Sequence, residues 1–185
     1  MILKGKGEFR GIGLVEVIWK LLTLILHSRL AAIKLHDVLH GFREGRGTGT
    51  ATLEAKLLQQ LAAIREEVLY VIFLDLTKAY DALDRSRTLE ILKGYRVGDR
   101  VRRLLATYWE RTTMVARAGR YYGKGFKGER GVTQGDPLSP TIFNMVVDAV
   151  VRHWLFLATQ EAERRGERGR GADTRRPFST RTTGW

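Results

Sequence analysis

The sequence predicts an α+β fold in which helices pack on a small, mostly antiparallel sheet. Apolar residues recur at helical spacing across residues 13–35 and again across 101–109. The short run Val68–Leu76 is β-branched, aromatic and almost wholly apolar, which is typical of a buried strand. Residues 112–118 and 121–132 are strand-like, and nearby glycines are available for turns.

The first half of the chain alternates helical and loop composition. The helical pattern of residues 13–35 leads into a polar, glycine-rich loop at Gly41–Gly49, and Leu53–Glu67 resumes a helical pattern. This loop is not a phosphate-binding loop, because it has no Gly-Lys-Ser/Thr ending and no preceding strand.

Three helices are predicted after the apolar run. Residues 86–92 form a short helix closed by Gly94, and Asp99 is suited to cap the next helix. Ser139 and Pro140 read as an N-cap followed by proline at the first helical position, and this helix runs to about Trp154.

The charge balance suggests a polyanionic partner. Lys and Arg number 32 against 20 acids, which gives a net charge of +12 and favours nucleic acid or an anionic membrane surface. A soluble protein with excess arginine has the same composition. The apolar stretch 14–30 is interrupted by charges, so it predicts a buried amphipathic helix, and we expect no membrane partner.

Cysteine is absent, which rules out disulfides and thiolate metal sites and agrees with a cytoplasmic location. The first residues do not form a signal peptide, because glycines and charges interrupt any apolar run. The four histidines show no metal-ligand spacing.

The first chemical signal is the run at 73–85, FLDLTKAYDALDR. It places Asp75 near the end of the predicted strand. Mg²⁺ prefers one or two protein carboxylates together with substrate phosphates, and a strand-end carboxylate suits it. A lone aspartate there also serves as a helix cap or turn former, and Asp81 and Asp84 fit that alternative.

The second signal is the run at 130–140, RGVTQGDPLSP. It combines a tight turn, the neutral amide of Gln134 and a helix N-terminus, which favours phosphate. A turn of this kind before a helix is common when it stands alone.

Together, in this order and about 50 residues apart, the two runs resemble motifs A and B of reverse transcriptases. The resemblance is to the bacterial kind found in group II introns and retrons and to the non-LTR kind. Thr133 stands where motif B usually has proline. Upstream, 41–43 and 9–12 resemble the family's fingers signatures, with Gly11 in place of the usual proline.

The resemblance covers about residues 3–157 and implies the fingers and partial palm of a right-hand polymerase. Residues 1–67 would be fingers-like and 68–158 a partial palm with motifs A and B. Residues 159–185 would be a disordered tail, since 161–185 hold seven Arg and almost nothing to bury.

The resemblance also implies roles for particular residues. Asp75 would be the catalytic carboxylate that binds a pair of Mg²⁺ ions, or Mn²⁺, and the Leu76 carbonyl could help. Tyr80 would lie under the incoming sugar as the gate against a 2′-hydroxyl, and Gln134 and Gly135 would line the nucleotide pocket.

Two arginines would act from the fingers. Arg43 and Arg10 would reach the triphosphate or the template. The partners implied are an RNA template, a DNA primer and deoxynucleoside triphosphates. Each role has a structural alternative: Tyr80 as a core aromatic, Gln134 as a turn amide and Arg43 as a surface cation.

Two-metal phosphoryl transfer needs carboxylates on both sides of the ion pair. In the family these come from motif C, Tyr-Ala-Asp-Asp, and no second carboxylate pair follows residue 154. We therefore expect this chain to be inactive alone. Residues 179–185 can be encoded by bases that read Tyr-Ala-Asp-Asp-Gly-Met in a shifted frame, so we interpret the tail as the product of a frameshift after about Thr159.

Three interpretations remain open. The chain is an RNA-directed DNA polymerase by descent, a non-catalytic fragment that binds RNA or template–primer, or a chain that does not fold stably because Val68–Leu76 is an uncovered apolar edge. The sequence does not decide the class of retroelement or the oligomeric state.

Overall fold

The computed structural model describes residues 2–3, 9–10 and 12–165, and for residues 2–3 and 9–10 only the backbone. The elements in chain order are β1 (Ile2–Leu3), β2 (Phe9–Arg10), α1 (Val17–Leu30), α2 (Thr48–Ile64), α3 (Arg85–Gly94), α4 (Asp99–Arg111), β3 (Met114–Ala118), β4 (Tyr121–Phe126) and α5 (Ser139–Arg164). The strands form two antiparallel pairs, β1 with β2 and β3 with β4.

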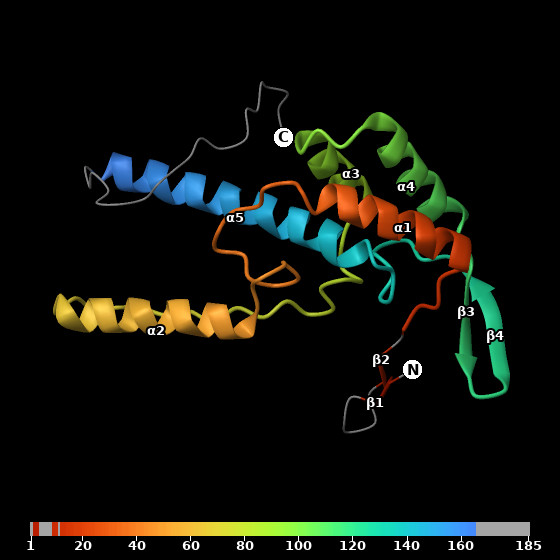
Figure 1. Ribbon diagram of the computed structural model, residues 1–185, viewed down its shortest axis with the longest axis horizontal. Coiled ribbons are helices and arrows are strands. Elements are labelled where there is room, and N and C mark those ends of the chain that lie inside the picture. The colour runs from red at the N-terminus through yellow and green to blue at the C-terminus, as the bar shows by residue number, and fades with distance from the viewer. Residues whose placement is uncertain (1, 4–8, 11, 166–185) are drawn as a thin grey trace.

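The core is made by helices. α1, α3 and α4 gather around the first half of α5 (Figure 1). The buried apolar residues come from these helices, their flanking loops and the turn before α5: Leu26, Leu35, Leu92, Val97, Leu105, Trp109, Val132, Leu138, Ile142 and Met145. None belongs to β3 or β4. The predicted helices and small antiparallel sheet are confirmed, but the helices pack on one another and not on that sheet.

The apolar stripe predicted in 101–109 explains part of this packing. Leu105 and Trp109 of α4 are buried as predicted, and Tyr108 beside them stacks on Trp19 of α1 with ring centroids 3.5 Å apart. α1 also meets α5, where His27 Nδ1 lies 2.6 Å from the Thr141 hydroxyl oxygen. The prediction that the stretch 14–30 forms a buried helix was wrong for most of its length: in α1 only Thr23 and Leu26 are buried, and Ile18 is 81% exposed.

A buried carboxylate connects three parts of the core. Asp148 of α5 is fully buried and accepts hydrogen bonds from the His36 backbone N–H at 2.5 Å, the Arg152 Nε at 2.6 Å and the Tyr95 hydroxyl. Burial, followed by the hydrogen bond and charge of Asp148, raises the pKa of Tyr95. Burial alone would lower the pKa of Arg152, but its bond to Asp148 raises it overall.

The prediction that Val68–Leu76 forms a buried strand was wrong. This run has no regular secondary structure, and its side chains are exposed; Phe73, for example, is 93% exposed. A strand needs neighbouring backbone to pair with its N–H and C=O groups. No described residue pairs with this run as a strand.

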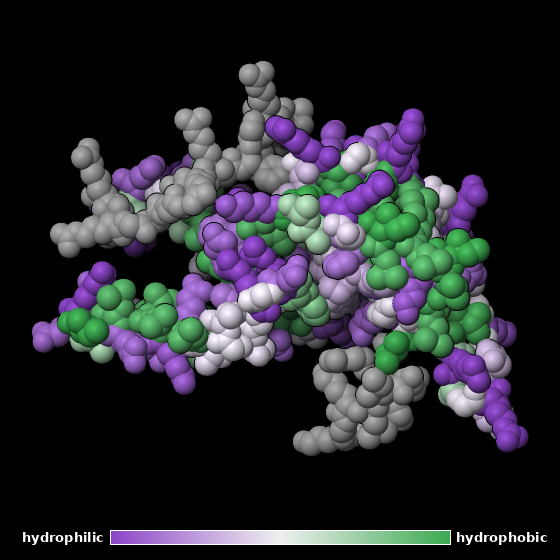
Figure 2. All heavy atoms as spheres, viewed as in Figure 1, coloured by the Kyte–Doolittle hydropathy of each residue, from purple (hydrophilic) through white to green (hydrophobic). Residues whose placement is uncertain are grey.

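α2 also lies outside the core. It begins at Thr48, earlier than the predicted Leu53, and none of its residues is buried. In Figure 1 it projects to the same side as the second half of α5 and away from α1, α3 and α4, and hydrophobic residues are exposed along it (Figure 2). Its apolar positions are therefore periodic without being packed.

Several helix ends differ from expectation. Leu138, not Ser139, is the N-cap of α5, so Ser139 and Pro140 lie in its first turn. Gly98, not Asp99, is the N-cap of α4; Asp99 lies in the first turn and pairs with Arg102 and Arg103. α5 continues past Trp154 to Arg164, so residues 159–164 are helical where a disordered tail was expected. The remainder of that tail, 166–185, lies outside the described residues.

α5 is long and apolar enough to cross a bilayer by length and composition. Its first half, however, carries core residues such as Ile142 and Met145, and Asp148 is bonded inside the domain. Core packing therefore accounts for the apolar character of that half.

Candidate active site

The turn before α5 is organised by Asp136. This buried side chain accepts from the Leu138 N–H at 3.0 Å through Oδ1 and from the Trp19 indole N–H at 3.0 Å through Oδ2. The Ser139 N–H donates to the Asp136 carbonyl oxygen at 3.1 Å. Asp136 thus shapes the turn of the second motif and fixes it to α1, a structural role that sequence reasoning did not assign.

The two sequence motifs are in direct contact. The Gly131 N–H donates to the Leu83 carbonyl oxygen at 2.8 Å, and the Val132 N–H donates to the Tyr80 carbonyl oxygen at 3.0 Å. Gly131 has a φ of 81°, and a Cβ there would lie 2.8 Å from both the Tyr80 oxygen and Asp81 Cα. Only glycine allows this close approach without strain.

Arg85 holds the same junction from the other side. Its Nε donates to the Gly131 carbonyl oxygen at 3.0 Å, and its Nη1 donates to the Trp109 carbonyl oxygen at 3.1 Å and to Gly128. The guanidinium lies over the Trp109 ring, 5.8 Å from its centroid, and burial lowers its pKa.

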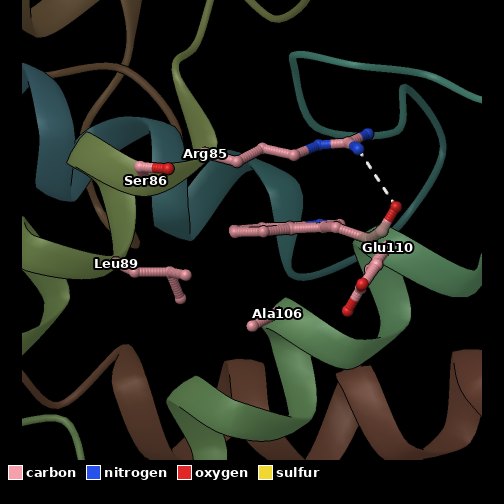
Figure 3. Close-up of a pocket in the computed structure, with 6 residues that line it drawn as sticks. Arg85, Ser86, Leu89, Ala106 and Glu110 are labelled. Carbon is pink, nitrogen blue, oxygen red and sulfur yellow. Dashed lines mark hydrogen bonds between the residues drawn. The ribbon is translucent and has the colours of Figure 1, made fainter.

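Figure 3 shows Arg85 beside a small hollow of about 220 Å³ between α3 and α4, where it points toward the C-terminal end of α4. Sequence reasoning gave Arg85 no role, although it directly follows the acids of the first motif. Its bonds to backbone carbonyls could not be read from the sequence.

Tyr80 is held between two aromatic rings. It stacks on Phe143 of α5 at 5.0 Å between centroids and meets the edge of Phe42 at 6.3 Å. Burial raises the pKa of its hydroxyl. This arrangement fixes the ring beside the turn of the second motif and is compatible with both roles predicted for it.

Gln134 and Gly135 meet the N-terminal segment. The Gly13 N–H donates to the Gln134 carbonyl oxygen at 2.6 Å. Gly135 has a φ of 108°, and a Cβ there would lie 2.5 Å from the Gly13 carbonyl oxygen. The Gln134 side chain is half-buried, while Gly135 is exposed.

Asp75 and Leu76 lie apart from this framework. Both are exposed, and Leu76 borders an apolar hollow of about 260 Å³ lined also by Leu83, Phe143, Val146 and Val150. Among the described residues no group of three or more His, Asp or Glu side chains is arranged to hold a metal ion. Asp75 is accessible to an ion but is not part of a preformed cluster.

The two arginines predicted to bind phosphate or template have different surroundings. Arg43 donates through Nη1 to the His36 carbonyl oxygen at 2.8 Å and to the Leu39 carbonyl oxygen at 2.9 Å, so it organises its own loop. The backbone of Arg10 pairs with Ile2 in the β1–β2 ribbon, and its side chain lies outside the described residues.

One protein family matches most of the chain. The family described as "Reverse transcriptase (RNA-dependent DNA polymerase)" matches residues 2–158. The chain belongs to the reverse transcriptase family. The runs 73–85 and 130–140, which were predicted to be motifs A and B, therefore contact each other within a reverse transcriptase domain.

The relatives of this reverse transcriptase domain come from insect retroelements. It is 28% identical over 147 residues to the "Retrovirus-related Pol polyprotein from type-1 retrotransposable element R2" of Nasonia vitripennis. It is 27% identical over 146 residues to the Pol polyprotein of the type-2 element R2DM of Drosophila melanogaster, and 29% identical over 153 residues to a type-1 R2 polyprotein of Popillia japonica.

These matches cover 78%, 78% and 80% of this chain but only 14%, 14% and 21% of the three polyproteins. The chain thus spans a small part of its relatives' length. The relatives are R2 elements, which supports the non-LTR side of the predicted resemblance; a bacterial group II origin receives no such support.

Proposed function

We propose that this reverse transcriptase domain contributes part of the centre that adds deoxynucleotides to a primer 3′-end on an RNA template. The observation that carries the proposal is the main-chain junction of motifs A and B. It holds the Tyr80 ring and the Gln134 turn on one framework, as a nucleotide pocket built from both motifs requires.

Three of the predicted site residues, Tyr80, Gln134 and Gly135, line the nucleotide pocket in that proposal. Tyr80, fixed between Phe42 and Phe143, limits the space beside the sugar of the nucleotide. Gln134 and Gly135 form the wall of the pocket next to the first turn of α5.

The donor set of Asp75 fits a divalent cation in part. Its carboxylate is exposed, and the neighbouring Leu76 carbonyl supplies a second hard oxygen, which suits Mg²⁺ or Mn²⁺ shared with substrate phosphates. A bound pair of such ions would stabilise the negative charge of the transferring phosphate. This chain would contribute Asp75 to that pair.

We also propose that the 185-residue chain does not polymerise by itself. No Asp-Asp pair occurs anywhere in its sequence, so the carboxylates that would complete a two-ion site are missing. The hidden Tyr-Ala-Asp-Asp frame after about Thr159 would supply them.

The test compares two proteins: the 185-residue chain, and the protein encoded when the same gene is read in the shifted frame after about Thr159. We expect the shifted-frame protein to extend a primer on an RNA template with Mg²⁺ and the 185-residue chain to give no extension. Asp75→Asn in the active protein should lower the rate at least about 100-fold. Glu90→Gln, which changes an exposed acid on α3, should leave the rate unchanged.

Two outcomes would contradict the proposal. If the shifted-frame protein is folded but does not incorporate deoxynucleotides, the proposed polymerase function is wrong. Extension by the 185-residue chain that survives Asp75→Asn would show that Asp75 has no part in the reaction.

A further inference from the structure

The β3–β4 hairpin projects from the helical body as a ribbon of its own (Figure 1). Its two strands pair only with each other among the described residues. Every residue of β4 is exposed, and so is every residue of β3 after Met114. Both faces of the ribbon are therefore accessible to a partner.

The ribbon carries positive charge without compensating acids. Residues 112–128 contain four cations and no Asp or Glu: Arg117, Arg120, Lys124 and Lys127. Hydrophilic residues gather at its free end (Figure 2). Some cations elsewhere on the described surface pair with an acid, as the exposed Arg103 does with Asp99. A surface of one sign attracts a polyanion.

Large aromatic side chains are interleaved with these cations. Tyr121 is 83% exposed and Tyr122 is 67% exposed. The guanidinium of Arg117 lies over the Tyr122 ring, 5.3 Å from its centroid, which keeps cation and ring on the same face. Exposed rings next to cations match a ligand that offers both flat bases and phosphates.

We infer that the β3–β4 hairpin binds single-stranded RNA, with Tyr121 and Tyr122 stacking on bases and Arg120, Lys124 and Lys127 contacting phosphates. Stacking requires unpaired bases, so a duplex does not satisfy the exposed tyrosines. The choice of RNA rests on the proposed function, in which the template is RNA. The hairpin would then hold template outside the junction of motifs A and B.

The test measures binding of a fluorescein-labelled oligouridylate of about 12 nucleotides to the full chain, without nucleotide or primer, over a series of salt concentrations. The charge variant carries Arg120→Ser, Lys124→Ser and Lys127→Ser. The control variant carries Lys56→Ser, Lys93→Ser and Arg100→Ser, which remove the same charge at exposed positions on α2, α3 and α4.

We expect the charge variant to bind at least about 10-fold more weakly at low salt. The slope of log affinity against log salt should become shallower by about 2 in magnitude. The control variant should keep most of the affinity and slope. The double change Tyr121→Ser and Tyr122→Ser should weaken binding about 10-fold or more without altering the slope, because stacking releases no counterions. Thermal melts establish that each variant is folded.

Equal losses in the hairpin and control variants would overturn the inference, as would tighter binding to duplex RNA than to the oligouridylate. These results are independent of the proposed function. If RNA binding depends on the hairpin but incorporation does not depend on Asp75, the proposed polymerase function is wrong and the inference about the hairpin stands. If incorporation depends on Asp75 but RNA binding ignores the hairpin, this inference fails alone.

Discussion

The Val132 N–H donates a 3.0 Å hydrogen bond to the carbonyl oxygen of Tyr80, and this bond joins the run 130–140 to the run 73–85, the predicted motifs B and A, through the main chain. The neighbouring bond from Gly131 to Leu83 continues the junction. Because both bonds are between backbone atoms, the junction tolerates side-chain changes in either run except where a side chain would enter the contact or, like that of Arg85, bonds to it.

Gly131→Ala should break that tolerance. A Cβ would lie 2.8 Å from the Tyr80 oxygen, and alanine is also disfavoured at the φ of 81°. We expect a loss of at least about 2 kcal/mol in the free energy of unfolding, measured with urea. Gly45→Ala is the matched control: its φ is 70° but nothing lies within 4 Å, so only the backbone penalty of about 1 kcal/mol applies. Equal losses at the two positions would mean that the close approach is unimportant.

Arg85→Lys should loosen the same junction. Lysine cannot reproduce the planar fork that bonds to the carbonyls of Gly131 and Trp109, nor the stacking on the Trp109 ring. We expect a loss of about 1–3 kcal/mol in chemical denaturation. Arg103→Lys, at an exposed position paired with Asp99, should change stability by less than about 0.5 kcal/mol. If Arg85→Lys leaves the free energy of unfolding unchanged, a positive charge at this position is enough to hold the junction and the guanidinium geometry is not needed.

Asp148→Ala should be among the most destabilising single changes. Removing this fully buried carboxylate leaves the Arg152 guanidinium, the Tyr95 hydroxyl and the His36 N–H without their acceptor. Breaking a buried pair from one side costs about 3–5 kcal/mol. Asp99→Ala removes a carboxylate with two exposed arginine partners and should cost less than about 1 kcal/mol. Similar unfolding midpoints for the two variants would contradict this account.

Tyr95 should make the domain sensitive to alkali. Burial and Asp148 raise its pKa, while an unfolded tyrosine ionises near about pH 10. The stabilisation is complete below that pH. Above it the unfolded state loses a proton first, so stability falls until the pH passes the pKa of the folded tyrosine.

We expect the melting temperature to fall as the pH rises above about 10, and Tyr95→Phe to make that fall shallower. Part of the fall should remain, because burial also raises the pKa of Tyr80 and Tyr108. Tyr121→Phe, at an exposed position, serves as the control and should leave the slope as it is. An unchanged slope in Tyr95→Phe would show that this hydroxyl does not couple to folding.

Phe73→Asp tests the exposed run before motif A. Phe73 is 93% exposed, so a charge there should leave the melting temperature within about 1 °C while reducing aggregation and dye binding. Leu92→Asp, at a fully buried position of α3, should unfold the domain. A large loss of stability in Phe73→Asp would mean that this side chain is packed in solution.

The sequence could predict the features that depend on local pattern. The stripe of α4 placed Leu105 and Trp109 in the core, and Gly119, with a φ of 61°, makes the turn that the glycine content suggested between β3 and β4. The reverse transcriptase family was recognised from the residues of the two runs, and the family match to residues 2–158 confirms the family; the assignment of the runs to motifs A and B stays a prediction.

Features that depend on distant partners could not be predicted. Val68–Leu76 has the composition of a buried strand, but burial requires a neighbouring strand that no composition supplies. The roles of Arg85 and Asp148 depend on contacts with residues far along the chain, such as Gly131 and His36. The predicted site roles of Tyr80, Gln134, Arg43 and Arg10 remain predictions.

The exposure of Val68–Leu76 has a consequence for cation affinity. On the proposed function, Asp75 is the ligand, yet its position is set by a run that has no ladder to hold it. Any strand that pairs with the run would order the carboxylate, and by thermodynamic linkage a bound ion would favour that pairing to the same extent. The affinity of Asp75 for Mg²⁺ would therefore depend on whether a strand pairs with Val68–Leu76. A titration with Mg²⁺ would measure that pairing together with the binding of the ion.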